Sequence, residues 1–224
     1  MRSIASANPA PLSSTSWSCP DMALAGFFDQ VPPLRLRDCL AQLLGASDDG
    51  IITYRYTDAV RLAGHSCPTV AGAWLSARAG LAALYPDDLP ERGGISVFLP
   101  GAEDEGVTGV IGQVLTLITG AAAANGFHGL AGDHRRSGLL HFDASGGDGV
   151  RMRRNDTGDT VEVQFNPRTV AADPEQMPLM GAVMNGAADA GQTRRFGELW
   201  QDRVRRLLIE HADDPRVIRV RHLA

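Results

Sequence analysis

The chain has 224 residues and a net charge of −5, with 44% hydrophobic and 21% charged residues. That length suits one large domain, which can bury a core without disulfide bonds. The acidic balance argues against a nucleic-acid-binding surface. No apolar run approaches the ~18 residues that a membrane span needs.

All 21 basic residues are arginines, so the chain contains no lysine. Schiff-base chemistry, a phosphate-loop lysine and a kinase-type lysine are therefore excluded. The sequence also lacks the dinucleotide-binding glycine turn, the Walker loop, the zinc-protease helix motif and the nucleophile elbow of serine hydrolases. These absences argue against nucleotide binding and serine hydrolysis.

The first residues and the cysteines point to a cytoplasmic protein. Residues 1–20 are rich in Ser, Pro and Ala and lack the continuous apolar stretch of a secretory signal. Cys19, Cys39 and Cys67 are too few for a disulfide framework, and no CxxC pair is present. We expect reduced thiols, a flexible N-terminal arm over 1–20 and one domain over 21–224.

The first half of that domain reads as helices around two short strands. In chain order, the spacing of apolar residues, the caps and the glycine stops predict a helix over 34–44, a strand over 51–56, a short helix over 59–63, a long Ala-rich helix over 68–85 and a strand over 95–99.

The second half adds more strands and two helices. The pattern predicts a helix over 107–123, a glycine-rich loop over 125–136, a three-strand meander over 139–143, 150–153 and 161–165, a helix over 194–211 and a strand over 217–220. The fold class is therefore α+β, with a mixed or antiparallel sheet and packed helices in a single domain. The 107–123 helix is apolar nearly all round, which indicates a core or a homodimer interface.

His65 and Cys67 stand two residues apart, directly before Pro68 at the predicted start of the long helix. A cysteine there faces the positive end of the helix dipole, which favours the thiolate. Imidazole and thiolate are preferred zinc ligands. Two interpretations stay open. The pair forms a metal or reactive-thiol site, or the two residues only begin a helix, one capping it and one buried.

Further ligands for a metal would have to come from elsewhere in the chain. The acidic loop before the 107–123 helix offers Glu103, Asp104 and Glu105, and three histidines are candidates too. Adjacent acids before a helix also complement its dipole, which is the simpler explanation of that loop. The histidines in question are His128, His134 and His141.

The 125–136 loop carries His128 and His134 and ends in Arg135 and Arg136. Arginine forks and glycine N–H groups can bind an anion. The alternative is a solvated surface turn. We take His128, His134 and Arg135 as the candidate contacts of a small anionic substrate.

The segment Gly64-His65-Ser66-Cys67-Pro68, opening an Ala/Gly-rich helix, resembles the signature of the FmdE-like family, which is named after a component of formylmethanofuran dehydrogenase. A strand, a polar loop and a helix ending in Ile118-Thr119-Gly120 resemble the family's second landmark. The similarity covers roughly 58–165. The first motif is fairly specific, whereas the second is weaker.

The resemblance implies an α+β homodimer that holds zinc or another divalent transition metal through His65 and Cys67. Where the family often supplies further cysteines, this chain has Ala102-Glu103-Asp104 and Ala121. Glu103 and Asp104 are therefore the expected replacements for a thiolate. The family's optional C-terminal zinc ribbon is missing.

Taken together, the sequence suggests a metal-binding protein. A metal with open positions would suit hydrolysis or lyase chemistry on a small anionic substrate. The alternatives are a non-enzymatic metal sensor, chaperone or accessory component of a larger enzyme, and a metal-free protein in which Cys67 is a reactive thiol. No nucleic-acid partner and no membrane contact are expected.

Overall fold

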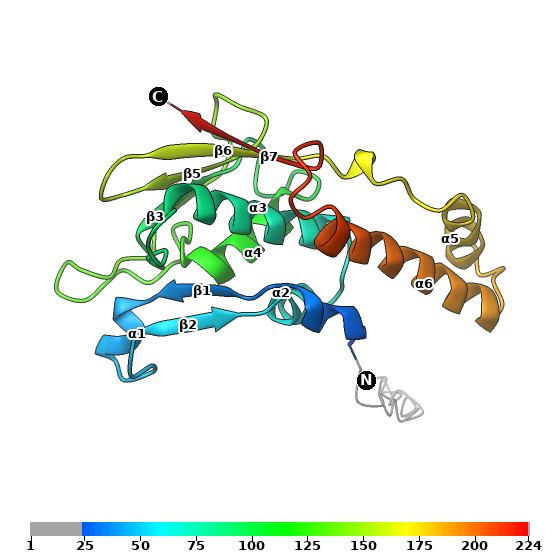
Figure 1. Ribbon diagram of the computed structural model, residues 1–224, viewed down its shortest axis with the longest axis horizontal. Coiled ribbons are helices and arrows are strands. Elements are labelled where there is room, and N and C mark those ends of the chain that lie inside the picture. The colour runs from blue at the N-terminus through cyan, green and yellow to red at the C-terminus, as the bar shows by residue number, and fades with distance from the viewer. Residues whose placement is uncertain (1–23, 224) are drawn as a thin grey trace, which may run out of the picture.

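A five-stranded sheet in the order β4-β3-β5-β6-β7 organises the fold, which a computed structural model describes for residues 24–223 (Figure 1). β4 runs parallel to β3, and the other neighbours are antiparallel. The predicted α+β class with a mixed sheet is confirmed, whereas the arm over 1–20 lies outside the described residues. The strands are β3 Ile95–Phe98, β4 Leu140–His141, β5 Val150–Arg154, β6 Thr160–Phe165 and β7 Ile218–Leu223.

Helix α3, Pro68–Leu84, lies between the sheet and helix α4, Thr108–Thr119 (Figure 1). Because α3 is enclosed on both sides, its small residues serve close packing. A Cβ at Gly72 would overlap the ring of Phe165, and a Cβ at Gly80 would overlap the sulfur of Met152 on the sheet. Packing therefore accounts for the Ala/Gly-rich composition of this helix.

Beyond α4 lies a small antiparallel hairpin (Figure 1). Helix α2 packs beside α4 and links the hairpin to α3. The hairpin consists of β1 Leu34–Arg37, α1 Cys39–Leu43 and β2 Ile51–Tyr54, and α2 spans Tyr56–Ala63.

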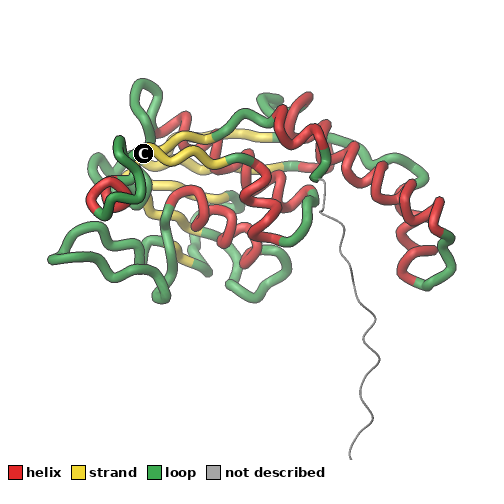
Figure 2. Tube along the Cα trace, turned by 90° about the horizontal axis from the view of Figure 1, so that it is seen from below, coloured by secondary structure: helices red, strands yellow, loops and turns green. Residues whose placement is uncertain are grey.

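The C-terminal helices form a second projection. Helix α5, Gln176–Met184, packs on α6, Ala190–Arg205, and the pair extends away from the sheet (Figures 1 and 2). A π-helical turn over Arg206–Glu210 continues α6 and buries Leu207 and Leu208. The chain then returns to the sheet as β7. Helix α5 was not predicted, because its apolar residues lie on all sides and show no period.

The predicted helix over 34–44 is wrong. Leu34–Arg37 is a strand, and only Cys39–Leu43 is helical. The Leu-Arg-Leu-Arg segment also alternates with period two, which suits a strand with Leu36 buried and its neighbours exposed. Asp38 then begins α1 as its N-cap, accepting hydrogen bonds from the backbone N–H groups of Leu40 and Ala41 at 3.1 Å each.

The predicted three-strand meander is wrong in its first strand. Leu140 pairs with Val97, so β4 lies on the opposite edge of β3 from β5. β5 and β6 do pair as consecutive antiparallel strands. Hydrophobic alternation shows that a segment is a strand, but it does not show which edge the strand joins. The last predicted strand is confirmed as β7.

One face of helix α4 is buried within this chain. Val114, Leu115 and Ile118 are fully buried, and Gly120, with a φ of +73°, ends the helix. The chain therefore covers this face by itself, and the homodimer stays a prediction. Among residues 24–223, no helix combines the length and the apolar character needed to cross a bilayer.

Asp38 connects the hairpin to the rest of the fold. Its side chain is buried, and it accepts hydrogen bonds from Arg136 at 2.7 Å and from Arg92 at 2.9 Å. Arg92 also donates to the carbonyl of Leu117 near the end of α4. Burial alone would raise the pKa of Asp38. The N–H of Ala41 and the two guanidiniums outweigh this effect and hold that pKa below its ordinary value.

We expect Asp38→Ala to destabilise the protein by about 3–5 kcal/mol, because it leaves the buried guanidinium of Arg136 and the half-buried one of Arg92 without their shared carboxylate. Urea denaturation followed by circular dichroism would measure the loss. Asp48→Ala, at an exposed carboxylate in the α1–β2 loop, is the matched control and should leave the midpoint unchanged. Equal midpoints for the two variants would contradict the role of Asp38.

The same interaction predicts a pH dependence. A lowered folded-state pKa means that the unfolded state binds more protons in acid. The stabilisation from Asp38 is therefore complete above about pH 4 and is lost as the pH falls through the folded-state pKa. In Asp38→Asn, the free energy of unfolding should therefore decrease less steeply below pH 4 than in the wild type.

Candidate functional site

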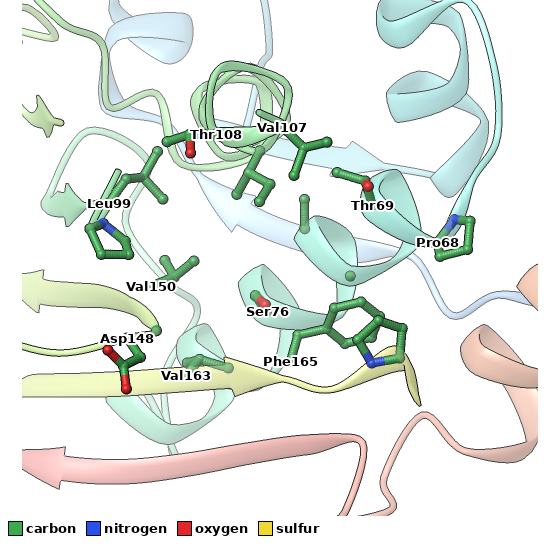
Figure 3. A pocket seen from close by; sticks show the side chains of 16 residues that line it. Pro68, Thr69, Ser76, Leu99, Val107, Thr108, Asp148, Val150, Val163 and Phe165 are labelled. Atoms are coloured by element: carbon green, nitrogen blue, oxygen red, sulfur yellow. The ribbon is translucent and has the colours of Figure 1, made fainter. Parts of the chain in front are cut away.

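A cavity of about 270 Å³ lies where the carboxyl end of β3 meets the first turns of α3 and α4 (Figure 3). Leu99 and Pro100 follow β3, and the adjoining ends of β5 and β6 form the sheet side of the cavity. The helix side comes from Thr69, Ser76, Thr108 and neighbouring residues. The remaining lining residues are Pro68, Gly72, Ala73, Val107, Ile111, Asp148, Gly149, Val150, Val163, Phe165 and Pro167.

Small residues on α3 keep this space open. Thr69, Gly72, Ala73 and Ser76 stand at helical spacing and therefore share one face of the helix. Phe165 of the sheet packs closely against Gly72, and beside this contact the small side chains of Ala73 and Ser76 leave space between α4 and the sheet. The sequence showed the small residues, but it did not show that they leave a cavity.

The polar groups of the cavity are few. Figure 3 shows the hydroxyls of Thr69, Ser76 and Thr108 on the helix side and the carboxylate of Asp148 on the sheet side. Ser76 is 3% exposed, whereas Asp148 is exposed. A mostly apolar lining with a few polar side chains is the usual character of a small-molecule site.

Both helices present their N-terminal ends at this cavity. α3 begins after Cys67 and α4 begins after Val107, and neither of these residues makes a side-chain capping bond. The first N–H groups of a helix have no partner within the helix, and they carry the positive end of its dipole. Pro68 has no N–H, and the N–H of Thr108 donates to the carbonyl of Glu105 at 3.0 Å. The cavity therefore combines the positive ends of two helices and three hydroxyls with apolar walls.

The loop over 64–68 is fixed through Ser66. Its hydroxyl lies 3.0 Å from the hydroxyl of Tyr56, and its carbonyl accepts hydrogen bonds from Trp200 and Gln201 of α6, at 3.0 Å each. Burial raises the pKa of Tyr56, so this tyrosine stays protonated. A helix that is remote in sequence thus holds the start of α3 in place.

His65 and Cys67 differ in their surroundings. His65 is exposed, and its Nδ1 lies 2.9 Å from the carbonyl oxygen of Ala63. Cys67 is half-buried and packs against the hydrophobic core at the N-cap position of α3. The next residue, Pro68, lines the cavity. The predicted motif therefore stands beside the candidate site.

The predicted carboxylate ligands belong to the loop before α4. Glu103 and Asp104 are exposed. Glu103 lines a second cavity together with Gly109 and Gln113 of α4, whereas Thr108 lines the α3–α4 cavity. Among residues 24–223, no three His, Cys, Asp or Glu side chains are grouped so that they could hold a metal ion. The structure thus does not bring the four predicted ligands together, and the metal stays a prediction.

Two of the three predicted anion contacts line a third cavity. His134 and Arg135 line a cavity of about 360 Å³ that shares no lining residue with the α3–α4 cavity. His128 is exposed, with its Nδ1 3.1 Å from the hydroxyl of Ser137, and it does not line that cavity. Arg92 lies there as well, although no pattern in the sequence had singled it out.

Comparisons with known proteins add little to this geometry. No family model matches the chain, and no curated protein matches it in sequence. A solved structure of a tungsten formylmethanofuran dehydrogenase FmdE-like protein from Syntrophus aciditrophicus is similar at a TM-score of 0.39 and 15% identity. The alignment covers 76% of this chain and 72% of that one. This is a distant likeness, and no residue role is transferred from it.

We expect Trp200→Phe to loosen the loop over 64–68, because the change removes one of the two donors to the Ser66 carbonyl. Losing one hydrogen bond costs about 0.5–1.5 kcal/mol. Alkylation of Cys67 should then become faster, as mass spectrometry of each cysteine peptide would show. Cys39, which lies outside this loop, is the internal control. Unchanged alkylation of Cys67 would show that α6 does not hold the loop.

Proposed function

We propose that this protein binds a small organic molecule in the α3–α4 cavity. The observation that carries the proposal is the meeting of two helix N-termini and the hydroxyls of Thr69, Ser76 and Thr108 with an apolar pocket at the end of β3. Donors at one end suit a carbonyl or carboxylate oxygen of the ligand. The walls of Leu99, Val163 and Phe165 suit its hydrocarbon part.

The size and charge of the cavity restrict the ligand further. A volume of about 270 Å³ is below the roughly 300–1,000 Å³ of sites for drug-sized molecules. The lining includes one charged residue, Asp148, and no arginine. A compact monocarboxylic acid, ketone or amide therefore fits this site better than a multiply charged anion.

Ligand-observed NMR with short-chain monocarboxylic acids, ketones and amides would test this proposal. Ala73→Met places a long side chain into the cavity and should abolish the saturation-transfer signals. Ala82→Met changes an exposed position of the same helix and should leave them intact. Signals that persist in Ala73→Met, or that no compound gives with the wild type, would overturn the proposal.

A second candidate function is the predicted metal site at His65 and Cys67. One observation favours it. The Nδ1 of His65 lies within hydrogen-bond distance of a backbone carbonyl, which leaves Nε2 as the nitrogen for an ion. Histidines that bind metals commonly donate their other N–H in this way. Zinc would then be held next to the cavity, where it could polarise a carbonyl.

Elemental analysis of protein purified without a chelator tests this second candidate. We expect about one zinc or other divalent transition metal per chain, and its loss in His65→Ala and in Cys67→Ser. His222→Ala changes an exposed histidine on β7 and should retain the metal. Metal content that neither substitution changes, or no metal at all, would count against the site.

A further inference from the structure

Arg136 is a buried cation with unused hydrogen-bonding capacity. Its side chain is 9% exposed, and one terminal nitrogen donates to Asp38. Its Nε is buried and has no hydrogen-bond partner among the described residues. A buried donor without a partner costs free energy, so such a group calls for an explanation.

Around Arg136, the buried and half-buried guanidiniums outnumber the buried carboxylates. Asp38 is shared by Arg136 and Arg92, so two guanidiniums face one buried carboxylate. The other donors of Arg92 bind the neutral carbonyl of Leu117. A further carboxylate that acts on Arg136, that of Glu91, is exposed, so positive charge exceeds negative charge only in the buried part of this cluster.

A cavity of about 360 Å³ opens beside this charge. Arg136, Arg135 and His134 contribute to one side of it. The Nε of Arg135 donates to the carbonyl of Ser137 at 2.8 Å, which fixes the base of that guanidinium. Because Arg135 forms no ion pair with another described residue, its charge is also available.

Two acidic residues share the lining of this cavity. Glu91 and Asp133 are both exposed there, and neither forms an ion pair within residues 24–223. They oppose a polyanion more strongly than a small anion, because repulsion grows with the charge of the ligand. A compact group with several acceptor oxygens matches two arginine forks best.

We propose that this cavity binds a small molecule through a phosphate group held by Arg135 and Arg136. Arginine forks are well suited to phosphate oxygens. The volume leaves room for a small organic part, so the ligand class is a phosphate monoester. The site shares no lining residue with the α3–α4 cavity, so neither proposal depends on the other.

Cys39 provides an internal reporter, because this half-buried thiol lines the cavity, whereas Cys67 does not. Inorganic phosphate is the probe, compared with chloride at equal ionic strength, and mass spectrometry follows the alkylation of each cysteine. At about ten times the Kd for phosphate, alkylation of Cys39 should slow about ten-fold, because only the free protein reacts. Alkylation of Cys67 should not change.

Arg135→Gln should remove the protection of Cys39. Arg153→Gln, at an exposed arginine on β5, is the matched control and should retain it. Absence of protection in the wild type, equal slowing of both cysteines, or protection that survives Arg135→Gln would each overturn the proposal. These results would not affect the NMR test of the α3–α4 cavity.

Discussion

The buried carboxylate of Asp38 is the contact on which several parts of this fold depend. It caps α1, and it binds Arg92 and Arg136 from two different connections of the chain. Gly93 has a φ of +88°, and a Cβ there would overlap the guanidinium of Arg136. The turn before β3 therefore has to carry glycine at this point. Removing the carboxylate would affect the hairpin, the end of α4 and the glycine-rich loop together.

The position of β3 explains why the two proposed ligand sites are separate. The glycine pair at 93–94 stands at its amino end, beside the arginine-lined cavity. Leu99 and Pro100 follow its carboxyl end, beside the α3–α4 cavity. The length of this one strand thus separates a charged site from an apolar one. The two sites can therefore select their ligands by different chemistry, by charge at one end of β3 and mainly by apolar contact at the other.

Local sequence signals predicted the elements better than their assembly. Pro68 marks the start of α3 as predicted, whereas α4 ends before Gly120 and not at 123, where the predicted helix ended. The partner of β4 and the burial of Asp38 depend on contacts between distant residues, which no local pattern records. The α3–α4 cavity escaped prediction for the same reason. Small residues on a helix indicate close packing or open space, and only the neighbouring elements decide between the two.

The segment His65-Ser66-Cys67 shows how support and chemistry can be divided among adjacent residues. Ser66 makes the contacts that hold the loop, to Tyr56 and to α6. Its neighbours on either side are then held in position without using their own reactive groups for support, apart from the Nδ1 of His65. Because this loop is already anchored, it loses little conformational entropy when a ligand binds. That argument applies to a metal at His65 and Cys67 and equally to an organic ligand beside Pro68, so the two candidate functions share one structural basis.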